Sequence, residues 1–146
     1  MEEREVFTLL RITGKHGGSV AIELDGSGTP GIPDTSGELM VHSDFVAGVT
    51  DTYVQPYDLA AWEHVLNEVE TGRDAVWRES ARVAEIGISL VDRSEEQDQI
   101  TVTVADQQST RVAIGLEVDR GWIDGQRALL HGIREAWQHV HPTALQ

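Results

Sequence analysis

The chain has 146 residues, no cysteine and a formal net charge of −14, from 25 acidic and 11 basic residues. This length suits one domain, and 40% hydrophobic residues exceeds what an acidic disordered chain contains. The lack of cysteine excludes disulfides and thiolate metal sites, and a pI near 4.6 argues against binding the phosphates of nucleic acid. With no long apolar run and an acidic N-terminus, we expect one soluble, cytoplasmic domain over residues 1–146 that does not span a membrane.

The first half of the chain shows the alternating apolar pattern of strands. Residues 25–37 contain nearly every turn-forming residue type, and we expect a long flexible loop there. A glycine-rich turn at 14–18 joins the first two strands into a hairpin. The predicted strands are residues 5–13, 20–24, 38–43 and 45–54.

A helix is predicted after Pro56, with Asp58 as a capping residue and Thr71-Gly72 as its end. Its apolar residues recur at helical spacing: Leu59, Trp62, Val65, Leu66 and Val69. Four further strands follow, at 74–78, 83–91, 99–105 and 110–118. A last helix is predicted over 122–140, with one apolar face that includes Trp122, Ile133 and Trp137.

This order indicates an α+β fold, mainly an antiparallel sheet of about seven or eight strands with two helices packed on one face. The segments Ala61–Val65 and Ala136–Val140 match at four of five positions, each in the helix that closes its half. One interpretation is a duplication into two similar ββββα halves. The other is a coincidence between two amphipathic helices.

The sequence contains no complete motif for catalysis, for cofactor binding or for metal binding. Gly26–Gly31 fits G-x-G-x-x-G, but Pro30 and Pro33 flank the last glycine and no helix follows. The acidic turn 92–98 lacks the glycine and glutamate positions of a calcium-binding loop. Neither H-E-x-x-H nor G-x-S-x-G occurs. We therefore expect no enzyme activity, no cofactor and no metal.

The negative charge is concentrated in residues 51–100, which hold 12 acidic and four basic residues. This segment is a candidate face for a basic protein partner, although plain solubility is the simpler interpretation. Trp62 and Trp137 lie on apolar helix faces, where core packing is the simpler interpretation, whereas Trp77 and Trp122 are each a candidate interface anchor as well. The candidate partner-binding residues are Glu63, Glu68, Glu70, Asp92, Glu95, Glu96, Asp98 and Trp77.

Four segments carry a resemblance to known families. Leu39–Ser43 leads into Phe45–Gly48, and the helix entry Gln55–Trp62 follows, with a closing helix around Ala136-Trp137. This layout is similar to a family of small bacterial domains of unknown function, over roughly residues 6–140. More distantly it resembles the immunity proteins that neutralise WapI-type toxins, which share a Pro-x-Asp-Leu helix entry. The second resemblance implies a non-enzymatic acidic protein that blocks a toxin by binding it.

Three functional hypotheses remain open from the sequence. The first is a protein-binding module, in its sharpest form an immunity-like inhibitor of a basic toxin or nuclease. The second is a self-associating structural or assembly protein, because strand 83–91 has apolar residues on both faces. The third, which the motifs favour least, is an enzyme or small-molecule binder with a pocket between helices and sheet.

Overall fold

The computed structural model describes residues 6–25, 35–79, 82–106, 108 and 110–140. Four strands and a helix are followed by four more strands and a second helix. The first half contains β1 (Val6–Thr13), β2 (Ser19–Asp25), β3 (Thr35–His42), β4 (Ala47–Val54) and α1 (Pro56–Glu70). The second half contains β5 (Ala75–Trp77), β6 (Glu85–Arg93), β7 (Gln97–Ala105), β8 (Arg111–Asp119) and α2 (Trp122–Val140).

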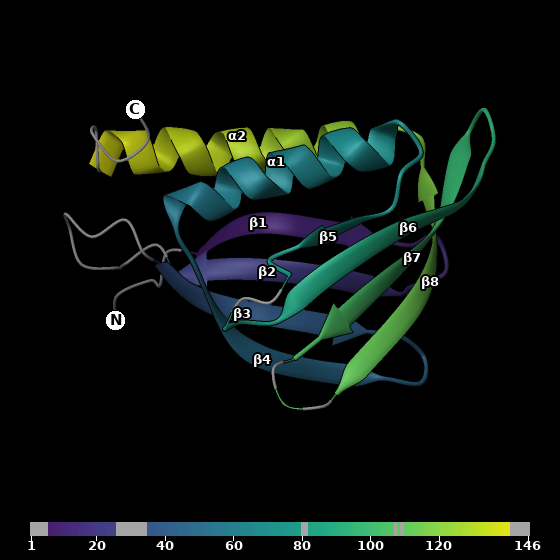
Figure 1. Cartoon of the computed structure of the whole chain (residues 1–146), viewed down its shortest axis with the longest axis horizontal. Helices are drawn as coiled ribbons and strands as arrows, with labels where there is room; N and C mark the ends of the chain where they lie inside the picture. The colour runs from purple at the N-terminus through teal and green to yellow at the C-terminus, as the bar shows by residue number, and fades with distance from the viewer. Residues whose placement is uncertain (1–5, 26–34, 80–81, 107, 109, 141–146) are drawn as a thin grey trace.

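The described strands form two antiparallel sheets, each built from consecutive strands in the orders β1-β2-β3-β4 and β5-β6-β7-β8 (Figure 1). Every neighbouring pair is antiparallel. The predicted α+β class, the eight strands and the two ββββα halves are therefore confirmed. The structure adds that the eight strands divide between two sheets.

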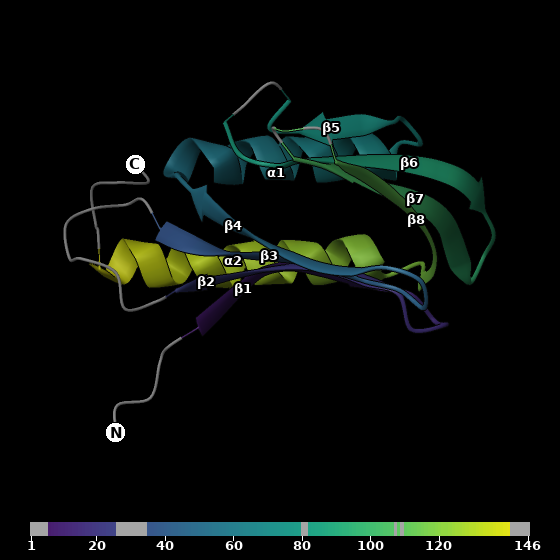
Figure 2. The ribbon, with the colours of Figure 1, turned by 90° about the horizontal axis from the view of Figure 1, so that it is seen from below.

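Each helix lies beside the first strand of the other half of the chain. Helix α1 follows the first sheet but packs against β5 and β6, whereas α2 follows the second sheet and packs against β1. Figure 2 shows the resulting two layers, with α1 beside β5–β8 and α2 beside β1–β4. The two helices also contact each other, so they close one side of the molecule together.

A single hydrophobic core fills the space enclosed by the sheets and helices. It follows the period-2 pattern of the strands, as in β7, where Ile100, Val102 and Val104 are buried. Both helices contribute a tryptophan: Trp62 of α1 has no exposed surface, and Trp137 of α2 is also buried. The apolar faces predicted for both helices are thus the faces that the core requires.

The match between Ala61–Val65 and Ala136–Val140 does not align the two halves. Trp62 lies in the middle of α1, whereas Trp137 lies near the end of α2. Both are buried because both occupy an inward helix position. The halves share a topology, and the short sequence match reflects two amphipathic helices.

The predicted loop 25–37 is shorter in the structure. Asp25 ends β2, and β3 already begins at Thr35. Strand pairing between Leu24 and Gly37 explains the difference, because backbone hydrogen bonding overrides the turn propensity of these residues. The rest of the loop, with Gly26–Gly31, lies outside the described residues.

The pairing of β2 with β3 requires a glycine at position 37. A Cβ atom added there would collide with the backbone oxygen of Glu23, which cannot move without breaking the sheet. A Cβ atom added at Gly48 in β4 meets no atom within 4 Å.

We predict that Gly37→Ala lowers the free energy of unfolding by about 1–3 kcal/mol, the usual cost of overpacking. Gly48→Ala is the matched control and should change it by less than about 0.5 kcal/mol. Urea unfolding followed by tryptophan fluorescence measures both. Equal effects of the two substitutions would contradict this account of the β2–β3 contact.

Candidate functional site

The acidic residues predicted on α1 are paired with arginines, most of them from α2. Glu63 lies 2.8 Å from Arg134, and Glu70 lies 2.8 Å from Arg127. The hydrogen bond from Arg127 is the main reason that the pKa of Glu70 is lowered. These contacts hold the two helices together, so the predicted acidic face on α1 is largely used within the protein.

Glu68 is also paired, although within its own segment. Its carboxylate lies 3.5 Å from the His64 imidazole and 3.4 Å from the Arg73 guanidinium. Surface pairs of this kind contribute little to stability. They nevertheless reduce the negative field that Glu68 would offer to a partner.

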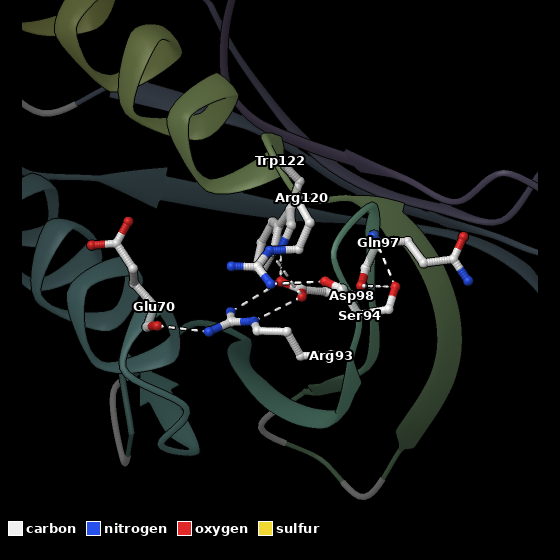
Figure 3. A network of polar contacts seen from close by, with 7 residues as sticks. All are labelled: Glu70, Arg93, Ser94, Gln97, Asp98, Arg120 and Trp122. Carbon is white, nitrogen blue, oxygen red and sulfur yellow. Dashed lines mark hydrogen bonds and ion pairs between the residues drawn. The ribbon is translucent and has the colours of Figure 1, made fainter.

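Asp98 was predicted on a surface turn, but its side chain is buried and belongs to a polar network (Figure 3). The guanidinium of Arg93 donates to both carboxylate oxygens, over 2.8 and 3.0 Å. The indole Nε1 of Trp122 donates to the same carboxylate over 3.0 Å. Asp98 therefore cannot contact a partner, and the prediction for this residue is wrong.

This network joins three separate elements of the fold. Arg93 of β6 also donates to the carbonyl oxygen of Glu70 at the end of α1, over 2.9 Å. Arg120, which precedes α2, donates to the carbonyl oxygen of Ser94 over 2.9 Å. Asp98 thus connects the end of α1, the β6–β7 turn and the start of α2.

The ionised form of Asp98 is favoured despite its burial. Burial alone would raise the pKa of this carboxyl group, but the hydrogen bonds from Arg93 and Trp122 and the charges of Arg93 and Arg120 outweigh it. The net result is a lowered pKa. The carboxylate therefore stabilises the fold when it is charged.

Trp77 is not available to a partner either. It has no exposed surface, its ring centroid lies 5.3 Å from that of Trp62, and its Nε1 donates to the carbonyl oxygen of Asp58 over 2.9 Å. The proposed interface anchor is thus a core residue. An isolated tryptophan on a three-residue strand gave no sequence signal to separate the two roles.

Arg78, next to Trp77, is buried in a left-handed conformation with φ of 62°. It donates to the carbonyl oxygens of Tyr53 and Ala84 over 2.9 and 3.0 Å, and its guanidinium lies 4.0 Å above the Trp77 ring. Burial lowers its pKa to about 10, so it stays charged at neutral pH. Because these contacts join β4 to the start of β6, we assign Arg78 a structural role.

The remaining predicted residues, Asp92, Glu95 and Glu96, are exposed around the β6–β7 turn. None of the three has an ion-pair partner among the residues that the structure describes. Figure 1 places this turn on the helix side of the molecule and β4 on the opposite side. Asp92, Glu95 and Glu96 form one candidate acidic surface, which we call the turn surface.

A second candidate surface lies along β4 and β8, the sheet edges opposite the helices. Three hollows of about 710, 170 and 380 Å³ follow each other there. The first two share Thr50, Ala84 and Asp106, and the last two share Val46 and Val112. They therefore form one continuous open groove between the two sheets, which we call the β4–β8 groove.

The middle of the β4–β8 groove is mainly apolar, and carboxylates lie around it. Four carboxylates and one arginine, Arg82, are among the described residues that line it. The carboxylates belong to Glu38, Asp44, Asp51 and Asp106. The apolar residues on its inner side are Leu39, Val41, Val46, Val104 and Val112.

Glu38 and Asp51 are paired directly across β3 and β4, and both are exposed. Neither carboxylate has an ion-pair partner among the described residues, and the same holds for Asp44. Like charges opposite each other on neighbouring strands are destabilising. Because Leu39 and Thr52 are buried, the alternation of the strands puts Glu38 and Asp51 on the outer face of the sheet, beside the groove. The rim of the groove thus presents negative charge that has no ion-pair partner among the described residues.

Exposed apolar residues accompany this charge. Phe45 precedes β4 and is 96% exposed, and Val49 within β4 is 62% exposed. Sequence reasoning missed both, because a strand that alternates gives no indication of whether its sheet edge is covered. The one available signal was the run Ala47–Asp51, which is poor in large apolar residues.

The described residues contain no group of three or more His, Asp or Glu side chains placed to hold a metal ion. Neither α1 nor α2 combines the length and apolar character that a membrane-crossing helix needs.

We predict that Asp98→Asn lowers the free energy of unfolding at pH 7 by about 3 kcal/mol, because Arg93 loses its buried counter-charge. The lowered pKa makes this stabilisation complete above the unfolded pKa, near 3.8, and lost as pH falls below it. The wild-type protein should therefore lose more stability than Asp98→Asn on acidification. Thermal unfolding from pH 7 to pH 3 measures this, with Asp92→Asn as the exposed control.

We also predict that Asp51→Asn raises the free energy of unfolding slightly, by about 0.3 kcal/mol, because it removes the repulsion from Glu38. The gain should shrink in high salt, which screens exposed charges. Asp92→Asn is again the control, since Asp92 faces the uncharged Gln99. A loss of stability in Asp51→Asn at low salt would show that Asp51 makes a favourable contact.

Comparisons with known proteins agree with one of the two resemblances. No curated protein and no solved structure matches the chain. A family of unknown function, DUF5959, matches residues 7–138, and nothing in that match connects the chain with WapI-type immunity proteins. The chain therefore belongs to the DUF5959 family.

Proposed function

We propose that the protein is a non-enzymatic binding module whose β4–β8 groove receives a basic region of a partner protein. The observation that carries the proposal is the unpaired negative charge of Glu38, Asp44 and Asp51 around an apolar groove. By contrast, the acidic residues of α1 already have basic partners within the chain. Unpaired charge beside exposed apolar surface is typical of an interaction site.

The net charge of −14 supports the same proposal through association kinetics. An acidic surface attracts a basic protein over distances of about one Debye length and increases the rate of encounter. Apolar contacts in the middle of the groove then supply affinity that salt does not screen. Binding should therefore weaken with salt without vanishing.

A binding role fits these carboxylates better than catalysis. Glu38 and Asp51 are both exposed, whereas a catalytic acid–base pair is usually tuned by burial. Asp44 lies in the turn before β4, and Asp51 lies four residues beyond the first residue of that strand, so the two carboxylates are separated along the edge of the sheet. Carboxylates spread in this way match a row of basic side chains better than one reacting bond.

The sharpest form of the proposal is an immunity-like inhibitor of a basic toxin or nuclease. It rests on the acidic groove and on the distant resemblance of the helix entry at Pro56–Leu59 to such inhibitors. The alternative is a self-associating assembly protein. The free edge of β4 favours that alternative, but two copies joined there would bring their acidic residues together.

The test compares two variants that remove the same charge from different surfaces. Glu38→Gln/Asp44→Asn/Asp51→Asn removes three negative charges beside the groove, and Asp92→Asn/Glu95→Gln/Glu96→Gln removes three from the turn surface. Each tagged protein is co-purified from its native cells at several salt concentrations. We predict that the wild type and the turn variant retain a basic partner, and that the groove variant loses at least about tenfold in affinity.

The opposite pattern would assign binding to the turn surface. Equal losses in both variants would show that only net charge matters, and equal retention would reject an acidic binding surface altogether. Sedimentation of the wild type tests the alternative, because a stable dimer at micromolar concentration would favour self-association.

A further inference from the structure

We propose that the partner contributes an extended segment that pairs with β4 as a fifth strand of its sheet. This inference rests on the proposed function and adds how the groove is filled. The segment would carry apolar residues toward the groove and basic residues on the alternate positions. Its chemistry is therefore that of a basic β-strand from another protein.

The backbone of β4 offers one side for such pairing. Among the strands that the structure describes, it is the last of its sheet and pairs only with β3. Figure 1 shows it at the bottom of the sheet, on the side that the helices leave open. Its first five residues are all exposed, and only Thr52 and Val54 are buried. An edge strand with unpaired N–H and C=O groups is a template for another strand.

The equivalent edge of β8 is partly occupied. The backbone N–H of Lys15, in the β1–β2 turn, donates to the carbonyl oxygen of Glu117 over 2.8 Å. His16 and Lys15 also pair with Glu117 and Asp119, at 2.7 and 3.4 Å. This turn covers the second half of β8, so β4 is the better edge.

The two faces of β4 determine which side chains the partner segment carries at alternate positions. Gly48 is paired with the buried Val41, so these two residues lie on the groove side of the sheet. Asp51 is paired with Glu38 on the other face. Because a new strand continues both faces, its inward residues meet apolar surface and its outward residues meet two carboxylates.

The repulsion between the carboxylates of Glu38 and Asp51 also indicates which kind of segment pairs with the β4 edge. A lysine or arginine beside them would relieve a repulsion that the free protein carries. A second copy of this chain would instead add its own Glu38 and Asp51 to the same edge. The charge therefore favours a basic partner over self-pairing.

The experiment uses a synthetic peptide of alternating Arg and Val, as long as the eight-residue β4. A second peptide carries N-methyl groups on alternate residues, which keep its charge but remove N–H donors along one edge. Amide chemical shifts of the intact protein locate each peptide. We expect the first peptide to shift amides of residues 47–52, and the methylated peptide to bind at least about tenfold more weakly.

Matched glycine variants test the site on the protein. Gly48→Lys places a positive charge at the groove, and Gly132→Lys places one on α2. A Cβ atom meets nothing within 4 Å at either position, so both variants should fold. We expect Gly48→Lys to weaken binding of the Arg-Val peptide at least about tenfold, and Gly132→Lys to leave it nearly unchanged.

Several outcomes would overturn the inference. Equal affinities of the two peptides would mean that backbone pairing is absent, and shifts confined to residues 92–96 would place binding elsewhere. A dimer of the free protein that Gly48→Lys abolishes would assign the β4 edge to self-association. If the peptide fails but partner capture still depends on Glu38, Asp44 and Asp51, the proposed function stands and strand pairing is wrong.

Discussion

In the part of the chain that the structure describes, two four-stranded sheets have four edges, and the two helices lie along only two of them. Helix α2 lies beside β1 and α1 beside β5, so the core is closed on one side. The edges formed by β4 and β8 have no helix, and the groove lies between them. The candidate site therefore lies between the two sheet edges that are not covered by a helix.

The ion pairs of the protein also follow from where the two helices lie. Because α1 and α2 meet on the closed side, the acidic residues of α1 find arginines on α2. The buried Asp98 network fixes the end of α1 and the start of α2 to the β6–β7 turn. Charge on the closed side is thus used for structure, whereas the carboxylates beside β4 have no such partners among the described residues.

Local patterns in the sequence predicted the elements well. Alternation in β7 and β8 and helical spacing in α1 and α2 each depend on a face that meets the core, and such faces are visible in a sequence. The division of the eight strands into two sheets could not be predicted from local patterns, because it depends on which strands do not pair with each other. The exchange of helices between halves likewise depends on long-range packing that no local pattern records.

The candidate site was harder to predict for a related reason. Asp98 and Asp92 belong to the same acidic segment, yet one is buried in an arginine network and the other is exposed. A strand register decides this, because alternate residues point to opposite faces. Glu38 and Asp51 lie 13 positions apart in the sequence, and only the β3–β4 register places them opposite each other.

The central claim is that β4 is an open edge that a partner covers, and amide hydrogen exchange tests it most directly. In the free protein, the amides of residues 47–52 that point away from β3 should exchange much faster than those of the central strands β2 and β7, which open only with the whole fold. Binding of the native partner should slow exchange of these outward-pointing amides most. Strong protection of these amides in the free protein, or partner-induced protection confined to residues 92–96, would contradict the account.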